Sequence, residues 1–274
     1  MRFKLQAFGL LLLSIPGLGQ DAFRPQYSKA IEDNSYFIEE AYNQEDRVVQ
    51  HISNGYYTVN PTKDFLYSFT QEWPFTGQKH QLSYTLGYSW LNSNTVNGLS
   101  DFMINYRYQL TGHDDFLTLA PRLSIIIPSG DEEKGLGNGV WGYQFNLPMS
   151  KRLSNAIVSH ANVGFTLLPG VKMYDSFGEE HKYTLWNMNL GASIIWLASE
   201  KFNLMLEGVH YINSSVNTDN KRETDQQSII SPGLRYAIDI NNLQIVPGIA
   251  IPVTLSEGDI EPGYFFYVSF EHPF

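Results

Sequence analysis

The segment His80-Gln-Leu-Ser-Tyr-Thr-Leu-Gly-Tyr-Ser-Trp-Leu91 alternates apolar or aromatic side chains with small or polar ones almost without error. A period of two puts every second side chain on one face, so it predicts a β-strand with one apolar and one polar face. The run is longer than an ordinary strand and has the length that a tilted strand needs to cross a membrane. We therefore interpret it as a membrane-spanning strand whose apolar face contacts lipid.

The same alternation recurs along the chain, and spacing of three and four, typical of helices, is not seen in these windows. Aromatic residues stand at the ends of the apolar faces, where the two interfacial girdles of a transmembrane barrel lie. A soluble β-sandwich also has alternating strands, but shorter ones, and we keep it as the less favoured alternative. The alternating windows are Phe65 to Trp73, Phe102 to Leu110, Trp141 to Met149 and Trp186 to Trp196.

Composition supports a barrel over the other membrane and soluble classes. The chain has 17 Tyr, 17 Phe and 5 Trp beside only 17% charged residues, yet its mean hydropathy is negative. A barrel reconciles these facts, because only every second strand residue faces lipid. The formal net charge of −10 argues against a nucleic-acid partner, since a phosphate backbone requires a basic surface. Without cysteine, disulfides and thiolate metal sites are excluded.

The N-terminus has the pattern of a secretory signal peptide. Arg2 and Lys4 precede the apolar run Leu5 to Ile15, and Gly17-Leu18-Gly19 supplies small residues for cleavage. The apolar run is too short for a spanning helix, which needs about 20 residues. We predict residues 1–19 as a signal peptide and the outer membrane of a Gram-negative bacterium as the destination.

Connections between the predicted strands alternate in length, as they do in outer-membrane barrels. We interpret the short ones as periplasmic turns and the longer polar ones as extracellular loops. Counting strands, including a weaker one from Val48 to Thr58, predicts a closed antiparallel transmembrane β-barrel of about twelve strands over residues 46–274. Residues 20–45 are left as a periplasmic N-terminal segment, and whether they enter the lumen stays open. The predicted turns are 76–79, 111–115, 150–156, 197–201 and 239–242; the predicted loops are 92–98, 128–139, 168–182, 213–226 and 254–263.

The last strand, from Tyr264 to Phe274, alternates aromatic residues and ends on phenylalanine at the carboxyl terminus. It resembles the C-terminal strand that the barrel assembly machinery recognises. We therefore predict Phe274 as part of an assembly signal, with that machinery, outer-membrane lipid and lipopolysaccharide as partners.

Three stretches together resemble a transporter family. They are Gly98-Leu-Ser-Asp-Phe-Met-Ile-Asn-Tyr-Arg-Tyr-Gln-Leu110, Ala120-Pro-Arg-Leu-Ser-Ile-Ile-Ile-Pro-Ser-Gly-Asp131 and Gly142-Tyr-Gln-Phe-Asn-Leu-Pro-Met-Ser-Lys-Arg152. They are similar to the outer-membrane transporters assigned to the meta pathway of phenol degradation, over most of the predicted mature chain. Ser100 departs from the family's Gly-Asp pair, and Ser129 replaces its threonine. The resemblance implies a barrel and a transport role.

Charged and hydrogen-bonding residues fall on the faces opposite the aromatic ones. Charges are costly in hydrocarbon, so we predict that these side chains line the lumen. One interpretation is a passage that selects solutes by charge; the other is opposite charges that pair across a narrow interior and fill it. The predicted lumen residues are Glu72, Asp101, Arg107, Arg122, His160, Glu207, Arg235 and Glu271.

Catalytic, cofactor and metal sites are not predicted. Ser159 lies on the presumed outward face of its strand, but no His-x-Ser arrangement flanks it. His181 beside Glu179 and Glu180 is most simply part of a solvated loop. The acidic loops lack the regular spacing of metal ligands. We therefore predict a channel or transporter for passive passage of small solutes, with hydrophobic or aromatic compounds as candidates. The alternatives are a closed structural or surface-interaction barrel and, third, an outer-membrane hydrolase.

Overall fold

The computed structural model describes residues 35–112, 115–217, 219–256 and 258–274, so the predicted signal peptide and residues 20–34 lie outside the described residues. The described residues form strands, turns and loops, and contain no helix long and apolar enough to cross a membrane. The strands are β1 (Val48–Thr58), β2 (Asp64–Pro74), β3 (His80–Leu91), β4 (Val96–Leu99), β5 (Phe102–Tyr108), β6 (Thr118–Leu119), β7 (Arg122–Ile127), β8 (Gly142–Ser154), β9 (Ile157–Tyr174), β10 (Glu180–Leu197), β11 (Phe202–Val216), β12 (Arg222–Tyr236), β13 (Ile238–Ile240), β14 (Leu243–Ala250), β15 (Val253–Ser256) and β16 (Asp259–Pro273).

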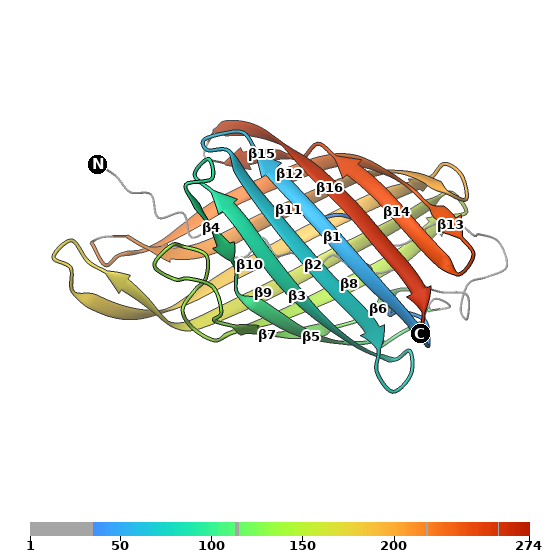
Figure 1. Ribbon diagram of the computed structural model, residues 1–274, viewed down its shortest axis with the longest axis horizontal. Coiled ribbons are helices and arrows are strands. Elements are labelled where there is room, and N and C mark those ends of the chain that lie inside the picture. Colours follow the sequence, from blue (N-terminus) through green and yellow to red (C-terminus); the bar gives the residue numbers. More distant parts are fainter. Residues whose placement is uncertain (1–34, 113–114, 218, 257) are drawn as a thin grey trace.

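These segments build a closed antiparallel barrel of 12 strands, which confirms the predicted fold class. Short interruptions divide four of the strands, so that β4 and β5, β6 and β7, β12 and β13, and β14 and β15 are each successive pieces of one. Closure joins β1 to β16, in register from Val48 opposite Pro273 to Thr58 opposite Gly263. Figure 1 shows these first and last strands, blue and red, side by side in the tilted wall. The weak strand predicted at Val48 to Thr58 is thus one side of the closing seam.

Burial follows the alternation that the sequence predicts. Along the last part of β10, for example, Ser193 and Ile195 are buried, whereas Ile194 and Trp196 are about half exposed on the outer face. A barrel in a membrane covers such exposed apolar side chains with lipid, so their exposure is expected outside a bilayer. The buried set on the other face points into the lumen.

The predicted loop boundaries are wrong at three places. Residues 168–182, 213–226 and 254–263 are mostly strand, because β9 and β10 pair out to Tyr174 and Glu180, and β11 and β12 pair out to Val216 and Arg222. Figure 1 shows the β9–β10 hairpin projecting well beyond the barrel wall. Outside a membrane no face of a hairpin needs a continuous apolar row toward lipid, and apolar side chains such as Val171 and Tyr183 belong to a buried cluster instead. The alternation of a spanning strand is therefore lost although the backbone ladder continues.

Which barrel end faces outward remains a prediction, and single-cysteine labelling checks it because the native chain has no cysteine. We expect Ser176→Cys, between β9 and β10, to react on intact cells with a membrane-impermeant thiol reagent. The matched variant Ser199→Cys, in the short connection between β10 and β11, should react only after the outer membrane is opened. Labelling of Ser199→Cys on intact cells would invert the topology.

Candidate functional site

An N-terminal segment, residues 35–44, lies inside the barrel, a placement that the sequence alone left open. Each of its ten residues is at most 2% exposed. The segment leads through Glu45 to Arg47 into β1, which begins at Val48. Its backbone therefore enters the lumen from the barrel end where β1 starts.

Side chains of the wall accept hydrogen bonds from the backbone of this inserted segment. Since a buried N–H without an acceptor is costly, these contacts satisfy a peptide that forms no strand of its own. The acceptors come from five different strands or their ends, so the segment is held from several sides. The donor and acceptor pairs are Phe37 N–H to Glu207 Oε1 (2.9 Å), Glu39 N–H to Asn162 Oδ1 (2.6 Å), Ala41 N–H to Ser150 Oγ (2.7 Å), Asn43 N–H to Gln109 Oε1 (2.8 Å) and Gln44 N–H to Gln81 Oε1 (2.7 Å).

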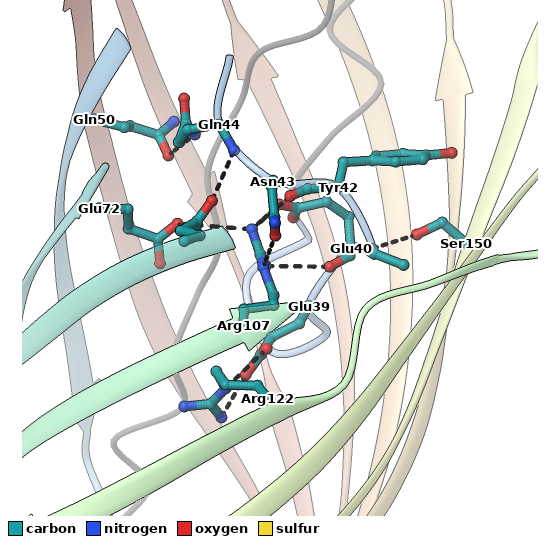
Figure 2. Close-up of polar contacts among 12 residues, drawn as sticks. Glu39, Glu40, Tyr42, Asn43, Gln44, Gln50, Glu72, Arg107, Arg122 and Ser150 are labelled. Atoms are coloured by element: carbon teal, nitrogen blue, oxygen red, sulfur yellow. Dashed lines mark hydrogen bonds and ion pairs between the residues drawn. The ribbon is translucent and has the colours of Figure 1, made fainter. Parts of the chain in front are cut away.

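Arg107, on β5, ties the inserted segment to the wall. Its guanidinium donates to Asn43 Oδ1 at 2.9 Å and to the carbonyl oxygens of Glu40 and Tyr42. The same group lies 3.7 Å from the Glu40 carboxylate and 3.9 Å from that of Glu72 on β2. Figure 2 shows Arg107 between the two carboxylates. A planar guanidinium with five donors suits this position, where one cation serves several oxygens.

Arg122, on β7, binds a second carboxylate of the inserted segment. Its Nη2 lies 2.6 Å from Glu39 Oε1, and its Nε donates to Glu39 Oε2 at 3.1 Å, a two-point contact visible in Figure 2. Three neutral wall side chains hold the rest of the guanidinium. They are Asn105, Ser124 and Gln144, each accepting a hydrogen bond at 2.9 Å.

The other end of the inserted segment is apolar and meets an apolar part of the lumen wall. Tyr36, Phe37 and Ile38 belong to one buried cluster with inward-facing side chains of several strands. The Phe37 ring lies 5.1 Å from the Phe265 ring and 6.0 Å from the Tyr56 ring, between centroids. The wall side of the cluster includes Ile52, Tyr56, Val209, Tyr211, Ile229, Phe265 and Tyr267.

Glycines in the wall make room for these apolar side chains. A Cβ atom on Gly248 would overlap with the Tyr36 ring and hydroxyl, and one on Gly191 would overlap with Ile38. Gly233 faces the Tyr36 ring from a third strand, where a Cβ would lie 2.6 Å from a ring carbon. The wall is therefore hollowed where the segment sits, and side chains of the segment fill the space.

Most of the residues predicted to line the lumen are buried on the inner face. Glu72, Arg107 and Arg122 form the charged group around the inserted segment, and the structure brings Glu207 to the backbone of that segment. His160 Nδ1 lies 2.7 Å from Ser150 Oγ, and the His160 and Tyr42 rings meet edge to face with centroids 6.2 Å apart. The full set of buried residues among those predicted is Glu72, Asp101, Arg107, Arg122, His160, Glu207 and Arg235, and Glu271 is partly exposed.

Asp101 and Phe274 are placed apart from this group. The Asp101 carboxylate accepts hydrogen bonds from the backbone N–H groups of Gly130 and Asn138, so it holds the connection between β7 and β8. Phe274 follows β16, is 67% exposed, and donates its N–H to the Arg47 carbonyl at 2.9 Å beside the closing seam. Its role in assembly stays a prediction.

Sequence reasoning left the placement of the inserted segment open and missed the apolar part of the lumen. The sequence did contain a feature that indicates a lumen-binding segment. Tyr36-Phe37-Ile38-Glu39-Glu40 combines three apolar residues with two carboxylates, and it directly precedes the strands whose inward faces carry arginines. It has no period that identifies a strand or helix, and its binding partners are far away in the sequence.

Two polar pairs bear on the hydrolase alternative. On the outer face, His210 Nδ1 lies 2.9 Å from Ser228 Oγ across β11 and β12, a pair that sequence reasoning did not find. In the described part of the chain no carboxylate or amide bonds to the other ring nitrogen, as a nucleophilic triad requires. At the β9–β10 tip, His181 Nε2 lies 3.1 Å from Asp175 Oδ2. Hydrogen bonds from the Glu179 backbone and from His181 lower the pKa of Asp175, which is consistent with an ordinary turn carboxylate.

Comparison with known proteins supports the fold without identifying a family. The sequence matches no protein-family model and no curated protein. An outer-membrane channel from Pseudomonas putida F1 aligns with a TM-score of 0.64 at 8% identity, covering 85% of this chain and 98% of that one. The NanC porin aligns with a TM-score of 0.56 at 14% identity, covering 80% and 98%. The chain thus has the fold of outer-membrane channels and porins.

Proposed function

We propose that this protein is an outer-membrane channel for the passive passage of small solutes, closed at rest by residues 35–44. One observation supports this above all: the lumen is filled by a separate segment and not by the side chains of the wall alone. A small closed barrel fills its interior with wall side chains. Here three wall glycines face the segment, so the wall by itself leaves space.

The lining of that space favours solutes with an apolar part. Phe265, Tyr267 and Tyr56 face the inserted segment from the wall, and aromatic side chains bind apolar and aromatic groups through area and ring geometry. Small hydrophobic or aromatic compounds are therefore the proposed cargo. Membership in the transporter family of the meta pathway of phenol degradation, which the sequence resembles, belongs to the same proposal.

Export and assembly complete the proposal. Residues 1–19 direct secretion, the barrel inserts among outer-membrane lipid and lipopolysaccharide, and the assembly machinery recognises the last strand with Phe274. The aromatic outer face of β16, with Tyr264 and Phe266 exposed, supports recognition of this strand.

Planar-bilayer recording of the whole mature chain tests the proposal. We expect brief, infrequent current steps that phenyl glucoside, a neutral aromatic solute, interrupts more strongly than glucose at the same concentration, because the apolar wall retains the ring. Equal interruption by the two solutes would contradict the apolar cargo. If neither the whole chain nor a variant lacking residues 35–44 gave steps, although both were folded by heat-modifiable gel mobility, the channel itself would be rejected.

A surface-interaction barrel is the second candidate, and the long β9–β10 and β11–β12 hairpins favour it. β9 and β10 pair out to Tyr174 and Glu180, and β11 and β12 pair out to Val216 and Arg222, so both hairpins present side chains for contact with a partner. Planar-bilayer recording separates the two functions, since a barrel that acts only through its hairpins gives no current.

A further inference from the structure

We infer that Arg122, with Asn105, Ser124 and Gln144 around it, is a carboxylate-binding site of the lumen wall that Glu39 occupies at rest. Solutes of the channel would then be small organic acids with an aromatic or aliphatic body, which compete with the inserted segment for this site. The inference rests on the proposed channel function and specifies its cargo.

The contact between Arg122 and Glu39 has the geometry of carboxylate recognition. Two guanidinium nitrogens reach the two oxygens of one carboxylate, at 2.6 and 3.1 Å. Such a two-point contact is stronger and more directional than a single hydrogen bond. Arg122 is 4% exposed, so little water competes for its donors.

Wall residues fix the guanidinium independently of the segment. Asn105 comes from β5, Ser124 from β7 and Gln144 from β8, and Gln144 in turn donates to Thr166 of β9 at 2.9 Å. Four strands therefore orient Arg122 before any carboxylate arrives. Preorganised donors of this kind are what a binding site requires.

Arg122 differs from Arg107 in whether a wall carboxylate remains next to it after the segment leaves. Arg107 lies 3.9 Å from Glu72, a carboxylate of the wall. Among the described residues, Glu39 alone places a carboxylate within ion-pair distance of Arg122. Departure of the segment would leave Arg122 without a carboxylate at ion-pair distance and with the cation of Arg107 opposite it on β5. An anion that enters the lumen can then take the place of Glu39.

The segment also indicates which group the solute carries beside its carboxylate. Phe37, two residues before Glu39, packs its ring against Phe265 and Tyr56. The segment thus presents an aromatic ring to the apolar wall and a carboxylate to Arg122. An aromatic acid combines the same two groups in one small molecule.

Benzoate, benzamide and acetate are the probes for a test on the full mature chain. Benzamide keeps the ring without the charge, and acetate keeps the charge without the ring. The variant Ala41→Cys places a thiol in the buried segment, and its rate of modification reports how often the segment leaves. We expect benzoate to raise this rate severalfold, and benzamide and acetate, which each offer one of the two groups, to act only at much higher concentration.

Charge-removing variants then assign the site. Arg122→Gln should abolish the effect of benzoate on labelling, whereas Arg222→Gln, at the exposed start of β12, should preserve it. Glu39→Gln should strengthen benzoate binding by roughly tenfold or more, since the competing charged contact is lost. Calorimetric titration of the cysteine-free chain with benzoate supplies a second measurement if Ala41→Cys does not fold.

Equal effects of benzoate and benzamide, or benzoate binding that survives Arg122→Gln, would overturn the inference. Labelling and calorimetry need no current, so they are independent of the channel test. A barrel that conducts without preferring benzoate would reject the carboxylate site and leave the channel. One that binds benzoate through Arg122 but never conducts would reject the channel and leave the binding site.

Discussion

Deletion of residues 35–44 from the mature chain will raise the time-averaged conductance by roughly tenfold or more, because the segment then no longer competes for the lumen. The wild-type barrel holds the segment through buried hydrogen bonds on several strands and through the Arg107 and Arg122 contacts. Each buried hydrogen bond contributes about 0.5–1.5 kcal/mol and those to charged groups more, so the open state of the whole chain is rare. Planar-bilayer recording at equal amounts of folded protein measures the change.

A point variant tests whether the inserted segment closes the lumen without deleting any residue. Gly248→Val should also raise the conductance, since a side chain at position 248 overlaps with Tyr36 and prevents the apolar end of the segment from seating. Gly208→Val is the matched control, because Gly208 lies on the exposed side of β11 and a Cβ there meets no atom within 4 Å. A deletion variant that folds and still conducts like the wild type would show that these residues are not the barrier.

Replacement of Arg107 by Met will lower the free energy of unfolding of the barrel by about 3–5 kcal/mol, the usual cost of breaking a buried ion pair on one side. Arg107 is 2% exposed and serves both Glu40 and Glu72. Removing the cation leaves two carboxylates close together in a dry interior, where like charges repel. Urea titration of the folded barrel in detergent, followed by tryptophan fluorescence, measures the loss.

Two further variants show whether the loss comes from buried charge. Adding Glu40→Gln and Glu72→Gln to Arg107→Met should restore part of the stability, because the interior then contains no uncompensated charge at this place. Lys134→Ala, which breaks the exposed pair between Lys134 and Asp131, should give no measurable change. An Arg107→Met barrel that unfolds at the wild-type urea concentration would indicate a hydrated lumen.

The sequence by itself determined the membrane-spanning part of the wall. Alternation at His80–Leu91 and in the windows like it fixes which face of each strand is apolar, and lipid on one side with a lumen on the other turns that local pattern into an inside and an outside. For this reason the alternation alone places Arg107, Arg122, Glu207 and Arg235 inward, and they are buried on the inner face.

Local patterns failed where a strand has no apolar face toward lipid opposite a polar face toward the lumen. The outer parts of β11 and β12 pair as a hairpin with mainly polar side chains. In the outer parts of β9 and β10, apolar side chains such as Val171, Met173 and Tyr183 belong to a buried cluster and not to a lipid-facing row, so neither hairpin shows the alternation of a spanning strand. Inward-facing aromatics such as Phe265 and Tyr267 were missed for a related reason. An inner face that is itself partly apolar gives the strand two apolar faces, and the period of two loses its meaning.

Only the tertiary structure decided what occupies the lumen. Residues 35–44 contain no repeat that predicts a conformation, and their partners Gln81, Ser150, Asn162 and Glu207 are spread over a long stretch of the chain. Sequence spacing carries information about neighbours along one strand, whereas barrel closure brings residues from all strands to one axis. The charges of Arg107 and Arg122 could therefore be predicted as inward, but their pairing with Glu40 and Glu39 depends on a segment that takes its shape from the closed wall around it.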